Sequence, residues 1–402
     1  MTRMFRSICI TAMLVLLGPY SDLQAQGPTD STFKPSGKVW GLGFGDFAFK
    51  ANADESNRGG TNQYTGMAAN QSMFQFRRVY LGYDYEISER FSSNFLLAME
   101  DNLVTTASST PVTSGDLLTN GRYSLFIKNA NVTWKNIFKG SHLSLGMVHT
   151  PAAVLLPELI WDYRCIERTI SELRRTPAWD MGVILSGTLH SAKKTEFGYN
   201  LMIGNGTASR PENNQFKWFY GDVYVKLFNK KLIIDLYADY NRMDLVPGAH
   251  HDRSMIKGLI AFTSPKFTIG IEAFTNTLRN DVIAMSADSS TSKIDTRAID
   301  YSIYARGRIY KDQLGFFVRY DNYDASLNTQ NDTYINYAPR TSNYDPNTVE
   351  QFFTAGLDFT PIDKIHIMPN VWYTGYKNAG PSSIEDGYDL VYRLSIYYVY
   401  GK

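Results

Sequence analysis

The sequence has little cysteine, with two residues in a chain of 402. Cys9 lies in the N-terminal segment, so Cys165 is the single cysteine that remains if that segment is removed after export. One thiol cannot form an intrachain disulfide. An exported chain of this length must therefore be held together by a large packed core or by a closed hydrogen-bonded structure.

Long hydrophobic runs and an excess of charge are also missing. Beyond the N-terminal segment, no stretch approaches the ~18 continuous apolar residues that a membrane-spanning helix needs. The chain has 40 basic and 39 acidic residues, and removal of residues 1–25 takes away two basic residues and one acidic one, leaving 38 of each. Because no basic excess is present to bind phosphates, we expect no nucleic-acid partner.

Sequence motifs for catalysis are absent as well. The chain contains no HExxH, GxSxG, CxxC or P-loop spacing, and its six histidines are scattered apart from the adjacent His250 and His251. The glycines of residues 41–45 precede no helix, so they do not form a dinucleotide-binding loop. We therefore expect no enzymatic activity, no cofactor and no bound metal.

The N-terminus has the features of an export signal. Arg3 and Arg6 precede an apolar run at residues 8–17, which Gly18 and Pro19 interrupt. The segment ends with Leu-Gln-Ala at 23–25, a plausible cleavage site. We predict that residues 1–25 form a signal peptide and that residues 26–402 form one exported domain.

Aromatic residues and alternating strands dominate that domain. Aromatics make up 14% of the chain, with 27 Tyr and 23 Phe, although mean hydropathy is −0.27. Apolar and polar residues alternate in run after run, as in a half-buried strand. The predicted strands are 40–50, 75–88, 91–101, 123–134, 142–150, 181–190, 196–204, 217–228, 232–242, 254–263, 267–277, 298–309, 313–324, 350–359, 364–376 and 388–400.

Short turns and long loops alternate between these runs, and each run is long enough to cross a bilayer at a tilt. The pattern predicts an all-β fold: a transmembrane antiparallel β-barrel of about 16 strands in the outer membrane of a Gram-negative-type bacterium. The phase of residues 123–134 shifts between Ile127 and Ala130, which predicts a bulge, and Pro369 predicts a distorted strand. The last strand places seven apolar or aromatic residues on one face: Tyr388, Leu390, Tyr392, Leu394, Ile396, Tyr398 and Tyr400.

Residues 151–180 break this rhythm. Apolar residues recur there at helical spacing (Leu159, Tyr163, Ile166, Ile170, Leu173), which predicts one short amphipathic helix from Pro157 to Pro177. Arg164, Arg168 and Arg175 fall opposite the apolar face, with Trp161 beside them. The segment follows the fifth predicted strand, so it is the third long loop of the barrel.

Three stretches resemble the porin family that includes the phosphate-selective porins O and P: residues 76–97, 160–189 and 197–207. The last strand resembles the C-terminal signal of bacterial outer-membrane proteins, which the barrel-assembly machinery reads, although Gly401 and Lys402 follow the final tyrosine. The resemblance implies a sixteen-stranded homotrimeric channel whose third long loop folds inward as a constriction. By strand phase, however, both signs of charge face the lumen, which argues against a phosphate-selective funnel. The predicted cations there are Arg78, Lys128, Lys226, Lys257, Arg306, Arg308, Arg319 and Arg393.

The expected function is passive diffusion of small hydrophilic solutes, with anions as a candidate class, through a water-filled channel. The candidate constriction residues are Arg164, Arg168, Arg175, Trp161 and Arg78. The arginines could contact passing solutes, or they could pair with carboxylates and only anchor the loop; the sequence leaves both open. A receptor or adhesin barrel and a barrel hydrolase are the alternative functions, and outer-membrane lipid is an expected partner.

Overall fold

The computed structural model describes residues 33–56, 58, 67–100, 125–174, 176–212, 214–242, 251–325, 334–339, 347–379 and 385–401. The predicted signal peptide at residues 1–25, the whole long loop at 102–122, His250 and Arg175 lie outside these ranges. The described strands are β1(Ser36–Asn52), β2(Gln71–Glu86), β3(Phe91–Glu100), β4(Phe126–Phe138), β5(Ser141–His149), β6(Trp179–Ser191), β7(Glu196–Gly204), β8(Trp218–Leu227), β9(Leu232–Arg242), β10(Asp252–Thr263), β11(Phe267–Ser286), β12(Thr291–Tyr310), β13(Leu314–Asp324), β14(Tyr334–Pro339), β15(Thr348–Ile362), β16(Ile365–Asn378) and β17(Gly387–Tyr400).

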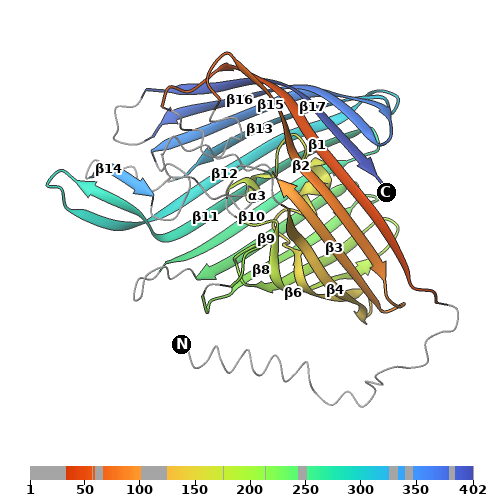
Figure 1. Cartoon of the computed structure of the whole chain (residues 1–402). Coiled ribbons are helices and arrows are strands. Elements are labelled where there is room, and N and C mark those ends of the chain that lie inside the picture. The colour runs from red at the N-terminus through yellow and green to blue at the C-terminus, as the bar shows by residue number, and fades with distance from the viewer. Residues whose placement is uncertain are drawn as a thin grey trace.

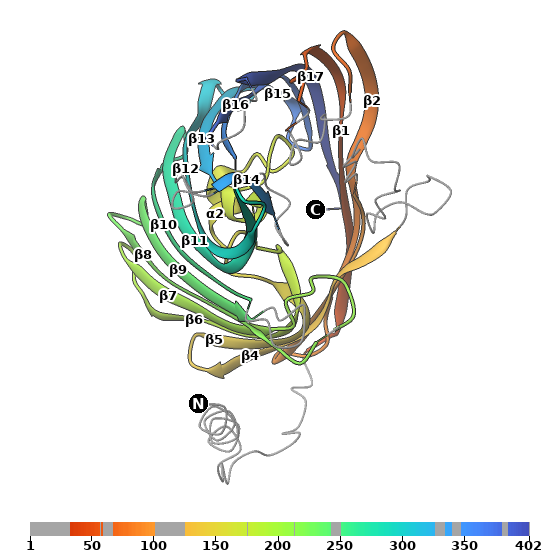
Figure 2. The ribbon, with the colours of Figure 1, turned by 90° about the vertical axis from the view of Figure 1, so that its left-hand side faces the viewer.

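Sixteen of these strands close into one antiparallel barrel (Figures 1 and 2). Neighbours in sequence pair with each other, β13 pairs directly with β15, and β1 closes the ring by pairing with both β2 and β17. A closed ring leaves no barrel strand with a free edge along its length. The fold predicted from the alternation is confirmed, with all sixteen predicted strands in place.

The remaining strand, β14, belongs to an extension of the barrel. Strands β11 and β12 continue their ladder to the pair Met285↔Thr291, and β14 adds to the edge of β11, from Val282↔Pro339 onward. Figure 1 shows this hairpin projecting to the left, beyond the neighbouring strand ends. The sequence predicted a loop between residues 277 and 298, which is wrong: most of these residues extend the β11–β12 ladder, after a register shift between Leu278 and Val282.

The two faces of the barrel differ as the alternation requires. Outward side chains are largely apolar and exposed, among them Leu145, Leu201, Ile256, Ile271 and Leu394. On β17 the outward phase of Tyr388, Tyr392 and Tyr400 is confirmed, while Asp389, Arg393 and Ser395 face inward and are buried. The inner face also carries buried aromatics, including Phe317, Phe352 and Trp372, so aromatic residues lie on both faces of the barrel.

Local irregularities set which side chains face the lumen. The β3–β4 register passes from Leu96↔Asn129 to Leu97↔Ile127, so Lys128 is an extra residue and the predicted bulge in β4 is confirmed. The β1–β2 register shifts in the same way at Arg77, which turns both Arg77 and Arg78 inward; this bulge was not predicted. The β15–β16 ladder passes from Gly356↔Asn370 to Phe359↔Ile367, skipping the positions beside Pro369.

Gly146 in β5 is required by its conformation. Its φ is 125°, and an added Cβ would lie 2.3 Å from the carbonyl oxygen of Ala130. We expect Gly146→Ala to destabilise the barrel by about 1–3 kcal/mol, because the side chain adds both strain and a backbone clash. The urea midpoint of the heat-sensitive gel-mobility shift measures this loss.

Gly258→Ala on β10 is the matched control, since its Cβ would meet nothing closer than Leu236 at 3.8 Å. An unchanged midpoint for Gly146→Ala would contradict the assignment of strain to this position.

No helix in the described part of the chain is long and apolar enough to cross a membrane.

Candidate channel constriction

The segment between β5 and β6 lies inside the barrel, where Figure 2 shows it within the ring of strands. It contains two helices, α2(Pro157–Trp161) and α3(Ile170–Arg174). Trp161 and Ile166 pack with Tyr304 and Phe317 of the wall in one buried cluster, and Ile170 packs with Met255 and Phe274 in a second. The prediction was an inward loop with one short helix; the loop does lie inside the barrel, but it carries two shorter helices in place of the single one.

The chain between the two helices is not helical, and wall cations donate to its carbonyl groups. Asp162 ends α2 in the left-handed conformation, with φ 64°. Beyond it, Nη1 of Arg77 donates to the carbonyl oxygens of Cys165 (2.8 Å) and Ile166 (2.9 Å). Helical spacing alone does not show that these carbonyls have partners on another element, so the break was not predictable from the periodicity.

Other wall cations hold the loop in the same way. Arg319 on β13 donates to the carbonyl of Arg168 at 2.6 Å, and Arg393 on β17 donates to that of Ile166 at 3.3 Å. Arg306 on β12 donates to the carbonyl of Ile160 at 2.9 Å, and Lys257 on β10 donates to that of Ala152. Cations from β2, β10, β12, β13 and β17 therefore bind the loop backbone.

Wall carboxylates bind loop side chains. The Arg174 guanidinium is buried and lies 3.3 Å from Asp300 and 2.8 Å from Glu350, on β12 and β15. The Tyr163 hydroxyl donates to Asp358 of β15 at 2.9 Å. Charged residues of both signs on the wall, which strand phase predicted, thus position the loop. The wall cations donate hydrogen bonds to loop carbonyl groups, and the wall carboxylates accept them from loop side chains.

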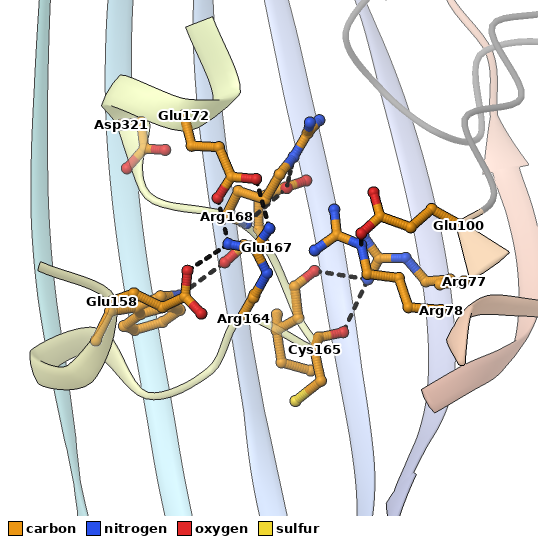
Figure 3. A network of polar contacts seen from close by, with 12 residues as sticks. Arg77, Arg78, Glu100, Glu158, Arg164, Cys165, Glu167, Arg168, Glu172 and Asp321 are labelled. Atoms are coloured by element: carbon orange, nitrogen blue, oxygen red, sulfur yellow. Dashed lines mark hydrogen bonds and ion pairs between the residues drawn. The ribbon is translucent and has the colours of Figure 1, made fainter. Parts of the chain in front are cut away.

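Arg164 lies between two loop carboxylates. Its Nη1 contacts Glu158 and Glu172, and its Nη2 contacts Glu172 as well (Figure 3). Burial raises the pKa of the Glu172 carboxyl, but the Arg164 guanidinium outweighs burial and lowers the pKa to about 2. The stabilisation from this pair is therefore present above pH ~4.3, the usual glutamate value, and is lost as pH falls through about 2.

The other predicted constriction residues lie in different settings. Arg168 keeps 21% of its side chain exposed and lies 3.5 Å from Glu167. Trp161 is 1% exposed and donates its indole N–H to the Glu167 carbonyl at 2.8 Å, so it packs against the wall and has no surface for a passing solute. Arg78 is buried, 3.7 Å from Glu100 on β3. The structure brings Arg164 and Arg168 into one polar network with Glu158, Glu167 and Glu172 (Figure 3).

Sequence reasoning missed two residues of this site. Arg77 was not among the predicted lumen cations, because strict alternation with Arg78 places only one of the two inside. Arg174 was not among the candidate constriction residues, since nothing in the local pattern signals its burial. Two adjacent arginines in a strand were the available signal of a bulge, because only a bulge lets two neighbouring side chains of a strand both face inward.

A cavity of about 780 Å³ lies beneath the loop. It reaches from α2 to the short turns at residues 264–266 and 363, and inward residues of β1 to β6 line one side of it. Within the described residues, no group of three or more His, Cys, Asp or Glu side chains is placed to hold a metal ion.

Cys165 tests the position of the loop. Its side chain is 8% exposed, and burial raises the pKa of the thiol to about 12. At pH 8 only about one thiol in ten thousand would then be a thiolate, the reactive form. We expect a charged methanethiosulfonate reagent to leave Cys165 unlabelled in the folded barrel, and to label it fully in urea. Rapid labelling of the folded protein would place the loop outside the wall contacts described above.

Comparison with known proteins gives a likeness of fold. No protein-family model matches the sequence, and no curated protein matches it. Among solved structures, the outer membrane channel DcaP of Acinetobacter baumannii aligns with a TM-score of 0.58 at 11% identity, covering 93% of this chain and 99% of that one. An anion-selective porin from Comamonas acidovorans aligns with a TM-score of 0.54 at 11% identity, covering 91% and 100%. OmpT of Vibrio cholerae, an outer-membrane protein, also aligns with a TM-score of 0.54 at 11% identity, covering 93% and 100%. These similarities show that the chain has a sixteen-stranded, porin-like barrel fold.

Proposed function

We propose that this chain is an outer-membrane porin that forms a water-filled channel for passive diffusion of small hydrophilic solutes. The observation that carries the proposal is the inward loop, which many wall residues hold inside a closed barrel with an apolar outer face. A loop bound in this way narrows the lumen to a fixed size, as a diffusion channel requires. The likeness in fold to a channel and to an anion-selective porin supports the same conclusion.

The charges at the loop bear on selectivity. Residues 151–178 contain four acidic residues, Glu158, Asp162, Glu167 and Glu172, and four basic ones, Arg164, Arg168, Arg174 and Arg175. Because the loop is formally neutral and Arg164 is bound by two carboxylates, we propose weak charge selectivity without phosphate preference. In this proposal, Arg168 and Arg175 are the residues that contact anions, and Arg164, Arg78 and Trp161 shape and hold the constriction.

The remaining parts of the proposal concern assembly. Residues 1–25 direct export and are removed. The β17 strand carries the signal for the barrel-assembly machinery, the exposed apolar belt contacts outer-membrane lipid, and three copies form a homotrimer. Gel mobility of unheated protein in mild detergent, with and without crosslinking, measures closure of the barrel and the number of copies.

Conductance across a planar bilayer tests the function. We expect purified, unheated protein to give steady ohmic current steps, and heat-denatured protein to give none. Folded protein, verified by its heat-dependent gel mobility, that inserts without conducting would overturn the porin proposal and favour a receptor, an adhesin or a barrel hydrolase.

A further inference from the structure

We propose that the cavity beneath the loop is a binding site for uncharged, hydroxyl-rich ring compounds, the chemical class of short neutral oligosaccharides. The proposal rests on the channel function above and names a class of solute for it. Its basis is the contrast between two parts of the cavity surface, one with uncharged hydrogen-bonding groups and one apolar.

The first part lies on β3 to β6. The residues that these strands contribute to the cavity lining include no Asp, Glu, Lys or Arg. Asn129, Asn131 and Thr133 project from β4 and Ser144 from β5. Asn131 donates to the Asn129 side chain at 2.6 Å, the Thr133 hydroxyl lies 3.4 Å from Asn131, and Thr133 and Ser144 share a hydrogen bond of 2.7 Å.

These contacts hold a row of amides and hydroxyls in fixed positions. Each amide has two donor hydrogens and an acceptor oxygen, and each hydroxyl can both donate and accept. A sugar hydroxyl also does both, so a fixed row of such groups suits it without any need for charge. A phosphate or a carboxylate would lack a cationic partner on this part of the wall.

The second part is an apolar strip on the loop and the closing strands. Leu159 on α2 is 68% exposed although it lies inside the barrel and lines the cavity. Val154 and Leu155 lie near it in sequence, and the half-buried Tyr397 of β17 also lines the cavity. Together these residues give the cavity an apolar surface of the kind that binding pockets combine with a few polar groups, and such a surface suits the C–H face of a ring.

The charged residues of the cavity are largely paired with one another. Arg306 lies 3.3 Å from Asp162, and Arg308 lies 3.8 Å from Asp358, both at the side formed by β12 and β15. The volume of about 780 Å³ is within the range of small-molecule sites, roughly 300–1,000 Å³. The cavity therefore has the size, the uncharged polar wall and the apolar strip that a ring-bearing neutral solute requires.

Calorimetric titration of the folded protein in detergent tests the site independently of conductance. The probes are sucrose, raffinose and maltotriose, with polyethylene glycol of similar mass as the control for nonspecific effects. We expect saturable binding of at least one sugar and none of polyethylene glycol. Leu159→Asp, at an exposed position that should not disturb folding, and the double variant Asn131→Ala/Thr133→Val should each weaken binding by about tenfold, the net contribution of roughly one hydrogen bond or one buried apolar group.

Asn322→Ala, at a residue that does not line the cavity, should bind like the parent. Folding of each variant is checked by heat-dependent gel mobility. If none of the sugars binds while the channel conducts, this inference is wrong and the porin proposal stands. If a sugar binds and depends on these residues while no current flows, the site stands and the channel function fails. Binding that both cavity variants leave unchanged would place the sugar elsewhere and also overturn the inference.

Discussion

Replacing Arg164, Arg168 and Arg175 together with alanine is expected to shift the channel strongly toward cations. The substitutions leave the formally neutral loop with three uncompensated negative charges. Screening by salt is weaker where water is scarce, so these charges act on ions at short range. A change of about 1 kcal/mol in the barrier for one sign of ion would already change the permeability ratio about fivefold. The reversal potential in a salt gradient measures the shift.

A variant of opposite charge provides the matched control. Glu158→Gln with Glu172→Gln removes the two carboxylates that bind Arg164 and leaves the loop with a charge of +2, so the reversal potential should move toward anions. Opposite shifts in the two variants would assign selectivity to the loop charges. An unchanged reversal potential in a folded, conducting triple-arginine variant would show that the arginines serve only to anchor the loop.

Replacing Arg77 with alanine is expected to release the loop. Arg77 donates to two loop carbonyls, lies 3.6 Å from Asp46 and places its guanidinium 5.2 Å from the Trp372 ring. Breaking a buried charged network by removing one partner typically costs about 3–5 kcal/mol. We expect larger and noisier single-channel current, together with rapid labelling of Cys165, which the loop contacts otherwise protect.

Two further variants isolate this role. Arg77→Lys should rescue only part of the effect, because an ammonium group cannot reproduce the planar fork of donors or its stacking. Lys226→Ala removes a wall cation that pairs with Glu196, and we expect steady current and a protected thiol. A quiet channel with protected Cys165 in folded Arg77→Ala would contradict the assignment of Arg77 as an anchor.

The strands were predictable because their signal is local. A period of two in apolar residues runs along the strands except at their bulges, since lipid-facing and inward side chains must alternate. The same reasoning located the β4 bulge, because the alternation of apolar residues changes phase between Ile127 and Ala130, around Lys128. It missed the β2 bulge, because Arg77 and Arg78 are chemically alike and either one satisfies the alternation.

The details of the constriction were less predictable because they depend on partners far apart in sequence. The spacing of Leu159, Tyr163 and Ile166 fits a helix, yet the chain between α2 and α3 is not helical, and arginines from β2, β13 and β17 donate to its carbonyl groups. Trp161 was expected to face solutes, yet Tyr304 and Phe317 of the opposite wall enclose it. The local sequence pattern shows neither the arginines nor the aromatic residues that contact the loop, because they come close to it only in the closed barrel.

The position of the loop anchors has a consequence for the order of folding. The Ile166 carbonyl accepts hydrogen bonds from Arg77 on β2 and from Arg393 on β17, and both arginines contact Asp46 on β1. Strands β1 and β17 are the first and the last of the ring, so these three side chains meet only after the ends of the chain have joined. We therefore expect the final docking of residues 165–166 to be a late event in folding. We expect the time course of Cys165 protection during refolding into detergent to match the appearance of the closed form on gels, and not to precede it.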